Sequence, residues 1–252
     1  MLSLRTPLLP VSFLAEYCLA EESSTAPLPD SVSFADGASL PVAAVTALQM
    51  LINHNFKAGD SVVIYGASGG VGTAAVQIVK ALSHGASRVT GVCSGANAAE
   101  VLALGADQVV DYTRGDEHLL SELGKTPFDF ALDTVSPPHG TKDYVPISKK
   151  VLKPSGTHVA VIGPTTAFIK AIFWRATGIR LQPKWYRLMI CIIESAQLTR
   201  VADMVVAKQL KSSVTASFSF DQASVDAAYE KLKARRVRGK LVVEIPTSAV
   251  SS

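Results

Sequence analysis

The regular alternation of strand-like and helix-like segments between Pro41 and about Leu210 is the feature that most limits how this chain can fold. Short runs rich in β-branched residues (SVVIYG, RVTGVC, QVVDY, FDFALDTV and THVAVIG) are separated by stretches with helical spacing of apolar residues, such as TAAVQIVKALSHG and EHLLSELG. Such alternation predicts parallel strands joined by right-handed helical crossovers. We therefore predict an α/β fold with a doubly wound parallel sheet, whose ligands bind beyond the carboxyl ends of the strands.

Both ends of the chain depart from this alternation. The N-terminal end has short extended segments interrupted by turns, and the C-terminal end reads SVTASFSF, then a helix from Asp221 to about Ala234, then GKLVVEI. We expect these flanks, residues 1–40 and 213–252, to form a smaller, β-rich element beside the sheet domain of residues 41–212.

Composition excludes several classes of protein. With 252 residues, 48% hydrophobic and 18% charged, the chain can bury a sizeable core and is not expected to be disordered. A formal charge of +3, with scattered basic residues, does not favour nucleic acid as a partner. The expected partner is a small-molecule substrate. Cys18, Cys93 and Cys191 lie far apart without a CxxC pair, which predicts no metal site and no disulfide framework. A reducing, cytoplasmic location fits best.

The first twenty residues, MLSLRTPLLPVSFLAEYCLA, have some features of a targeting signal. Pro7 and Pro10 interrupt any apolar helix there, which argues against a secretory signal or a membrane span. An organelle presequence remains an open alternative.

The stretch AFIKAIFWRATGIRLQPKWYRLMICII mixes aromatic residues with cations. Its cations are Lys170, Arg175, Arg180, Lys184 and Arg187. Because Gly178 and Pro183 break the stretch and the cations are too many for a span, no stable membrane insertion is expected. Two interpretations stay open: an interfacial helix at a membrane surface, and, favoured here, a helical region on the substrate side or at a subunit interface.

The sequence VVIYGASGGVG, residues 62–72, predicts a buried strand, a tight turn and the start of a helix near Val71. Its four glycines are Gly66, Gly69, Gly70 and Gly72. Glycines allow close approach to the backbone, and a helix start offers unpaired N–H groups and a positive dipole end, so the turn predicts a pyrophosphate site. The spacing of Gly70, Gly72 and Ala75 also fits the GxGxxG/A dinucleotide fingerprint. The alternative is a turn needed only for strand-helix packing.

The end of the next strand bears on the choice between NAD and NADP. A carboxylate there usually holds the ribose hydroxyls of NAD, but RVTGVCSGANAAE has none before Glu100. Since an acid about 4 Å from a phosphate costs on the order of 1–4 kcal/mol, its absence leaves room for the extra phosphate of NADP. Ser94 and Asn97 can donate hydrogen bonds to it, whereas Arg88 lies at the wrong end of the strand. NADP is therefore preferred.

These sequence features are similar to those of a known protein family. The chain resembles the zinc-free quinone oxidoreductase and enoyl reductase branch of the medium-chain dehydrogenase/reductase superfamily from about residue 12 to residue 245. The matching blocks are FLAEYCLA, APLPDSVSFADGASLPVAAVTAL, AGDSVVIYGASGGVG, LGADQVVDY, FDFALDTV, LKPSGTHVAVIG and ARRVRGKLVVEI. The resemblance implies a Rossmann domain at 41–212, flanked by the last part of a GroES-like barrel at 1–40 and a return segment to it at 213–252.

The resemblance also implies roles for individual residues. For the pyrophosphate, it implies the backbone of Ser68, Gly69, Gly70, Val71 and Gly72. Around the adenosine phosphate it implies Ser94, Asn97 and Tyr112, and near the nicotinamide Thr46, Ile162 and Gly163. Alternatively, Thr46 only caps or packs a helix, and Tyr112 is an ordinary aromatic residue at a strand end.

Relatives normally begin with a longer GroES-like segment, which supplies much of the substrate pocket and, in zinc-dependent members, the catalytic zinc ligands. Because only its last portion is recognisable here, we expect no zinc. The resemblance further implies a homodimer that forms through the sheet edge.

The leading hypothesis is an NADPH-dependent oxidoreductase that transfers hydride to an activated C=C bond (enoyl or enone) or to a quinone, while hydrogen-bond donors stabilise the developing enolate. No catalytic residue is assigned, since solvent can return the proton. A catalytically incomplete NADP(H)-binding sensor or partner protein is the alternative. A short-chain dehydrogenase, with Tyr229 and Lys233 as a catalytic pair, is a weaker rival because that pair falls in the closing helix.

Overall fold

The computed structural model describes the chain in several stretches, residues 14–135, 142–161, 163, 165–178, 183–234 and 237–246. The chain divides into two compact units. The larger unit is Thr46–Cys191, and the smaller unit combines Met1–Val45 with Ile192–Ser252.

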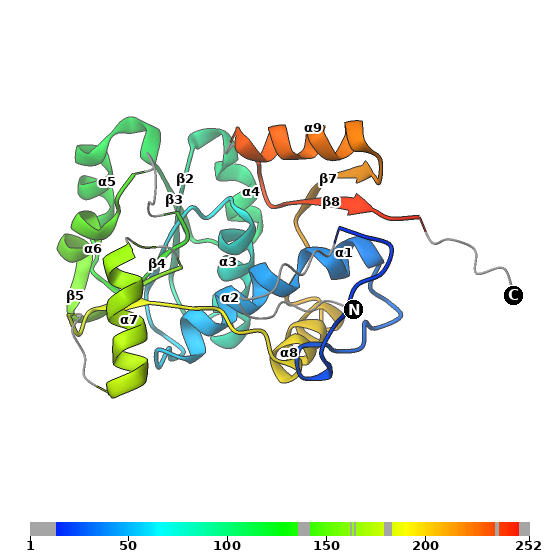
Figure 1. Ribbon diagram of the computed structural model, residues 1–252. Helices are drawn as coiled ribbons and strands as arrows, with labels where there is room; N and C mark the ends of the chain where they lie inside the picture. Colours follow the sequence, from blue (N-terminus) through cyan, green and yellow to red (C-terminus); the bar gives the residue numbers. More distant parts are fainter. Residues whose placement is uncertain are drawn as a thin grey trace, which may run out of the picture. The chain divides into compact units, whose positions relative to one another are not determined.

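The larger unit is built on a six-stranded sheet in the order β3-β2-β1-β4-β5-β6, and all its strand pairs are parallel (Figure 1). Its strands are β1 (Val62–Tyr65), β2 (Val89–Cys93), β3 (Gln108–Asp111), β4 (Phe128–Asp133), β5 (Leu152–Ala160) and β6 (Tyr186–Leu188). The chain runs outward from β1 to β3 and then returns to place β4 on the other side of β1. The predicted doubly wound α/β fold is thus confirmed, with its switch point between β1 and β4.

Helices cover both faces of this sheet, as right-handed crossovers require (Figure 1). One face carries α3 (Gly70–Leu82) and α4 (Ala98–Ala103), and the other carries α5 (Asp116–Leu123), α6 (Val145–Val151) and α7 (Thr165–Thr177). Short 3-10 helices, η2 (Gly95–Asn97) and η3 (Tyr112–Arg114), follow β2 and β3. None of the helices in the described ranges has both the length and the apolarity needed to cross a bilayer.

The core of the larger unit lies between the sheet and these helices. Every residue of β1 and β2 is buried, because strands covered on both faces contact no water. Alternate residues of β1, Val63 and Tyr65, join the cluster that packs against Leu119 of α5 and Ile147 of α6. The Tyr65 ring also stacks on Tyr144 with centroids 4.3 Å apart. The sheet is therefore a rigid support for the loops at its ends.

The smaller unit contains α1 (Phe34–Ser39), η1 (Glu22–Ser24), α8 (Ser195–Val206), β7 (Val214–Ser219), α9 (Gln222–Lys233) and β8 (Lys240–Glu244), and α2 (Pro41–Ile52) begins in it. β7 and β8 pair in parallel, so α9 connects them. The Asp221 side chain accepts the Ser224 N–H at 2.9 Å and starts α9 where the sequence predicts. The extended segments expected at the N-terminal end form no strand within residues 14–33, where Pro27 and Pro29 lack an N–H donor.

Candidate functional site: the glycine turn between β1 and α3

The turn after β1 depends on a glycine conformation. Gly66 has φ +77°, a region that other residues rarely adopt, and a Cβ there would lie 2.2 Å from Val135 Cγ2. The N–H groups of Gly66 and Ala67 both donate to the Val92 carbonyl, at 3.0 and 3.1 Å. These two bonds tie the turn to the carboxyl end of β2.

Two further glycines keep the turn compact. The Gly69 N–H donates to the Gly66 carbonyl at 2.9 Å, so the chain folds back on itself. A Cβ on Gly72 would lie 2.1 Å from that same carbonyl oxygen, whereas one on Gly69 would lie 3.3 Å from it. Close backbone packing thus explains Gly72, which supports part of the packing-only alternative for this turn.

The first turn of α3 nevertheless presents its N–H groups outward from the strand ends. Gly69 is the N-cap and has no side chain to accept from them. The Thr73 N–H, which donates to the Gly69 carbonyl at 2.9 Å, makes the first bond of the helix, so those of Gly70, Val71 and Gly72 have no acceptor within it. The first turn also carries no acidic residue. This surface has the chemistry of an anion site at the positive end of a helix dipole.

The structure brings two of the predicted residues together. Asn97 Nδ2 donates to Ser68 Oγ at 3.1 Å, which links the turn after β1 to the turn after β2. Ser94 precedes η2, and its carbonyl accepts the Asn97 N–H at 2.9 Å. Tyr112 begins η3 after the adjacent strand and is 42% exposed. Ser68, Ser94, Asn97 and Tyr112 therefore share the carboxyl edge of β1, β2 and β3.

Sequence reasoning missed a carboxylate at this edge. Asp111, opposite Cys93 in the β2-β3 register, has its Oδ2 2.6 Å from where a Gly95 Cβ would lie. Its Oδ1 accepts the Thr113 hydroxyl at 2.7 Å and the Thr113 N–H at 2.9 Å, and these bonds hold the pKa of Asp111 below its usual value. The expected position for such an acid was the end of β2 alone. Asp111 ends β3, and parallel pairing brings the ends of β2 and β3 to one edge of the sheet.

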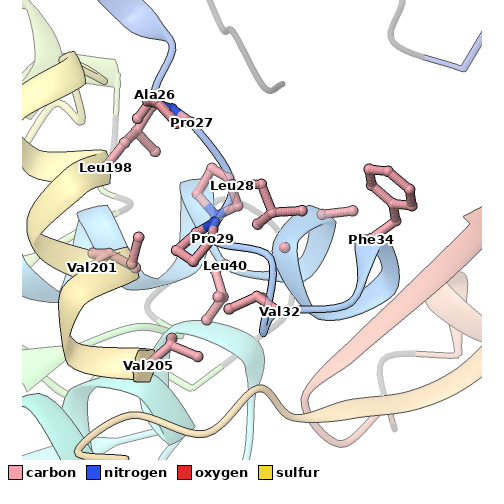
Figure 2. A pocket seen from close by; sticks show the side chains of 14 residues that line it. Ala26, Pro27, Leu28, Pro29, Val32, Phe34, Leu40, Leu198, Val201 and Val205 are labelled. Carbon is pink, nitrogen blue, oxygen red and sulfur yellow. The ribbon is translucent and has the colours of Figure 1, made fainter. Parts of the chain in front are cut away.

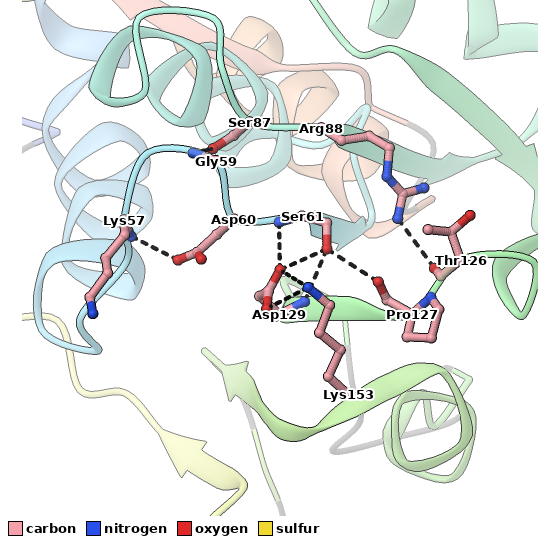
Figure 3. Close-up of polar contacts among 10 residues, drawn as sticks. All are labelled: Lys57, Gly59, Asp60, Ser61, Ser87, Arg88, Thr126, Pro127, Asp129 and Lys153. Carbon is pink, nitrogen blue, oxygen red and sulfur yellow. Dashed lines mark hydrogen bonds and ion pairs between the residues drawn. The ribbon is translucent and has the colours of Figure 1, made fainter.

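Arg88 confirms its predicted place away from that edge. Its Nη2 donates to the Thr126 carbonyl at 3.2 Å, and its guanidinium lies 4.5 Å from the centre of the Phe128 ring. Figure 3 shows this opposite end of the sheet, where Asp129 accepts from Ser61 and pairs with Lys153. Charged groups at this end join strands rather than face a ligand.

Of the three residues predicted near the nicotinamide, the structure describes two, Thr46 and Gly163. Thr46 is 5% exposed, and its hydroxyl forms a hydrogen bond with Cys191. This bond lowers the pKa of the Cys191 thiol, but burial raises that pKa by more. This contact accords with the packing alternative for Thr46. Gly163 is buried, and a Cβ on it would lie 3.0 Å from Tyr186 Oη. Ile162 lies outside the described residues.

The described part of the chain does not suit a zinc ion. Within it, no three His, Cys, Asp or Glu side chains come together. Cys93 is buried, and this burial raises the pKa of its thiol to about 11.

The smaller unit has an apolar pocket of about 230 Å³ (Figure 2). Among its walls are Pro29 and Leu40 on one side and Leu198 and Val201 of α8 on the other. All its lining residues are apolar, so their side chains offer no donor to polarise a carbonyl group.

Known proteins share both the sequence and the fold. The family described as zinc-binding dehydrogenase matches residues 104–243. NAD(P)H oxidoreductase RTN4IP1, mitochondrial, from Homo sapiens is 31% identical over 92% of this chain and 61% of its own. Quinone-oxidoreductase QR1, chloroplastic, from Triphysaria versicolor is 31% identical over 92% of this chain and 68% of its own. The solved quinone oxidoreductase from Coxiella burnetii has a TM-score of 0.70 and 30% identity, over 86% of this chain and 63% of its own.

A doubly wound sheet whose first crossover starts at an open glycine turn defines the dinucleotide-binding class of α/β proteins. Within that class, the chain belongs to the zinc-binding dehydrogenase family of the medium-chain dehydrogenase/reductase superfamily, as the sequence resemblance predicted. It spans 61% of the length of the human relative.

Proposed function

We propose that the chain is an NADPH-dependent oxidoreductase that reduces an activated C=C bond or a quinone by hydride transfer. The observation that carries this proposal is the open first turn of α3, where three N–H groups follow an N-cap without a side chain. The family supports it, because the relatives described above are named as NAD(P)H and quinone oxidoreductases. A tomato relative, 30% identical over 52% of its own length, is named 2-methylene-furan-3-one reductase.

The chain's own residues would bind and orient. The backbone from Ser68 to Gly72 would bind the diphosphate, and Gly66 and Gly72 allow the close backbone packing that shapes the turn. A bound nicotinamide nucleotide would supply the hydride. We propose no acid in the chain for the proton, which solvent would supply. Quinones and enones both accept hydride, because both have an electron-poor carbon conjugated to a carbonyl group.

The preference for NADPH over NADH is a proposal with arguments on both sides. Ser94 and Asn97 supply hydrogen-bond donors at the edge where the 2′-phosphate would lie. The negative charge of Asp111 argues against binding of the 2′-phosphate. Its carboxylate, however, already accepts hydrogen bonds from Thr113 and from the Gly95 N–H. At an exposed site, one like charge about 4 Å away costs only about 1 kcal/mol in water, so several donors can outweigh it.

The test is binding and turnover by the purified chain. We expect NADPH to bind, seen by nucleotide fluorescence, and to be oxidised when a quinone or an enone is added. Gly69→Asp should abolish both activities, because an N-cap aspartate accepts the free N–H groups and repels the diphosphate while still favouring the helix. The matched control is Ser121→Asp, which adds the same charge on the exposed surface of α5.

The outcomes separate the hypotheses. Failure of the unaltered chain to bind either nucleotide would refute the cofactor site. Tight NADPH binding without oxidation across quinones and enones would refute the enzyme and favour the sensor or partner protein. Equal effects of Gly69→Asp and Ser121→Asp would place the nucleotide elsewhere.

A further inference from the structure

The peptide group that joins Tyr65 to Gly66 is where β1 passes into the glycine turn. On one side, its N–H group donates to the Val92 carbonyl of β2 at 3.0 Å. On the other side, its carbonyl accepts two hydrogen bonds from Thr134, the residue after β4. The Thr134 hydroxyl donates at 2.8 Å and the Thr134 N–H at 3.3 Å. Both strands that flank β1 therefore hold this single peptide group.

The Thr134 hydroxyl also lies close to the next peptide group of the turn. Its Oγ1 is 3.5 Å from the Gly66 carbonyl oxygen, which accepts the Gly69 N–H. A hydroxyl has one hydrogen, so Thr134 donates it to the nearer Tyr65 carbonyl. A Cβ on Gly66 would lie only 2.7 Å from Thr134 Oγ1. The absence of a side chain at position 66 thus lets Thr134 reach the turn.

The segment that carries Thr134 is anchored on both sides. Asp133, directly before it, lies opposite Tyr65 in the β1-β4 register and is fully buried. Its Oδ1 accepts the N–H of Val135, directly after Thr134, at 3.0 Å. The carboxylate therefore bends the chain around Thr134 and fixes the position of its hydroxyl.

A glycine turn depends on such outside support. Glycines have more backbone freedom than other residues, and this turn contains Gly66, Gly69 and Gly70. A site made of backbone N–H groups binds an anion well only when those groups are already held in the binding geometry. A bond from β4 to the first peptide group of the turn restricts that freedom.

We propose that Thr134 is a positioning residue for the nucleotide. Its hydroxyl fixes the Tyr65–Gly66 peptide group from the β4 side and so holds the turn in the arrangement that binds the diphosphate. This inference rests on the proposed function, which makes the turn the diphosphate site. Without the hydroxyl, a smaller fraction of the free protein has that arrangement, and the apparent Kd rises in inverse proportion.

The first experiment is fluorescence titration of NADPH and NADH with Thr134→Val, which keeps the β-branched shape and the N–H but removes the hydroxyl. We expect the Kd for NADPH to rise roughly threefold to tenfold, the range that one hydrogen bond covers. The Kd for NADH should rise by the same factor, because both nucleotides contain the diphosphate. Thr134→Ser keeps the hydroxyl and should bind nearly as the unaltered chain does.

The second experiment measures the turn itself, without nucleotide. Amide hydrogen exchange in residues 62–72 should be faster in Thr134→Val than in the unaltered chain, and saturating NADPH should slow it again. The urea midpoint should change little, because the Thr134 N–H still donates to the Tyr65 carbonyl.

The matched control is Thr90→Val in β2. Thr90 is fully buried, and its hydroxyl has no hydrogen-bond partner within the described residues. This variant makes the same chemical change in a neighbouring strand and should leave both nucleotide affinity and exchange unchanged. Thr134→Ala gives a second removal of the hydroxyl should Thr134→Val fold poorly.

Three results would overturn the positioning role. They are equal behaviour of Thr134→Val and Thr90→Val, a loss of affinity for NADPH alone, and a loss in Thr134→Ser as large as in Thr134→Val. Failure of the unaltered chain to bind either nucleotide would instead refute the proposed function. The exchange experiment would then still decide whether Thr134 holds the turn.

Discussion

At the scale of single residues, Gly72 leaves the least room for a side chain. A methyl group there would lie 2.1 Å from the Gly66 carbonyl oxygen, a backbone atom that cannot move without opening the turn. We expect Gly72→Ala to lower stability by about 1–3 kcal/mol and to weaken nucleotide binding. Urea unfolding and fluorescence titration measure the two effects. Gly69→Ala, whose Cβ would lie 3.3 Å from the same oxygen, is the comparison and should cost less stability than Gly72→Ala.

Asp111 tests the choice of nucleotide. Asp111→Asn keeps an oxygen that can accept from Thr113 but removes the charge beside the β2 turn. We expect the Kd for NADPH to fall by about fivefold, corresponding to roughly 1 kcal/mol, with little change for NADH. Titration of both nucleotides with the two proteins is sufficient. An equal change for NADH and NADPH would show that the 2′-phosphate lies away from Asp111.

His158 makes stability depend on pH. It is fully buried, with Nδ1 2.9 Å from Ser148 Oγ, and burial lowers its pKa to about 4 although Asp133 Oδ2 is 3.6 Å from Nε2. Because the unfolded pKa is about 6.5, the unfolded chain binds more protons between these values. Stability should therefore fall as pH drops from about 6.5 to about 4, by on the order of 3 kcal/mol.

Urea midpoints across this pH interval measure the effect. His158→Asn should flatten the pH dependence, whereas His84→Asn, at an exposed histidine, should leave it unchanged. A profile that stays equally steep in His158→Asn would assign the dependence to other groups.

At the scale of elements, Asp129 holds three strands together at the amino ends of the sheet. Ser61, just before β1, donates through both N–H and Oγ at 2.9 Å, and Lys153 of β5 lies 2.8 Å away. Partial burial opposes ionisation, yet Lys153 and Ser61 hold the pKa of Asp129 below its usual value. Asp129→Ala should cost about 1–3 kcal/mol, because the Ser61 donors lose their acceptor. Thermal unfolding measures it, and Glu122→Ala, at an exposed pair with Lys125, should show no such loss.

Element prediction from sequence succeeded where the apolar pattern was long. β1 to β4 and α3 to α5 lie where the runs and periodicity place them. β5 begins at Leu152, earlier than the predicted strand THVAVIG. Its first residues include Pro154 and Gly156, which resemble a turn in sequence, and its pairing with β4 shifts register there. β6 has three residues, too few for a strand signal.

The sequence predicted the local structure of the glycine turn, but it did not predict contacts between residues that the sheet brings together. The glycine turn was evident because one stretch contains it all. The approach of Asp111 to Gly95 and the bond between Thr46 and Cys191 depend on strand order and helix packing, which a single sequence does not encode locally. The ligand roles of all the predicted site residues stay predictions.

At the scale of the whole molecule, nucleotide binding should stabilise the fold by mass action. At free NADPH about 100 times its Kd, the expected gain is about 2.7 kcal/mol, or roughly 5–10 °C in Tm. Thermal unfolding with and without NADPH measures it. The gain should vanish in Gly69→Asp and persist in Ser121→Asp. An equal gain in both variants would mean that NADPH binds outside the turn.

The contacts at the two ends of the parallel sheet involve separate sets of residues. Ser94, Asn97 and Asp111 lie at the edge opposite the clamp formed by Ser61, Asp129 and Lys153. Mutations can therefore accumulate in the loops at one edge without loosening the strands at the other. Loop substitutions that alter the proposed nucleotide preference are therefore expected to leave the protein folded.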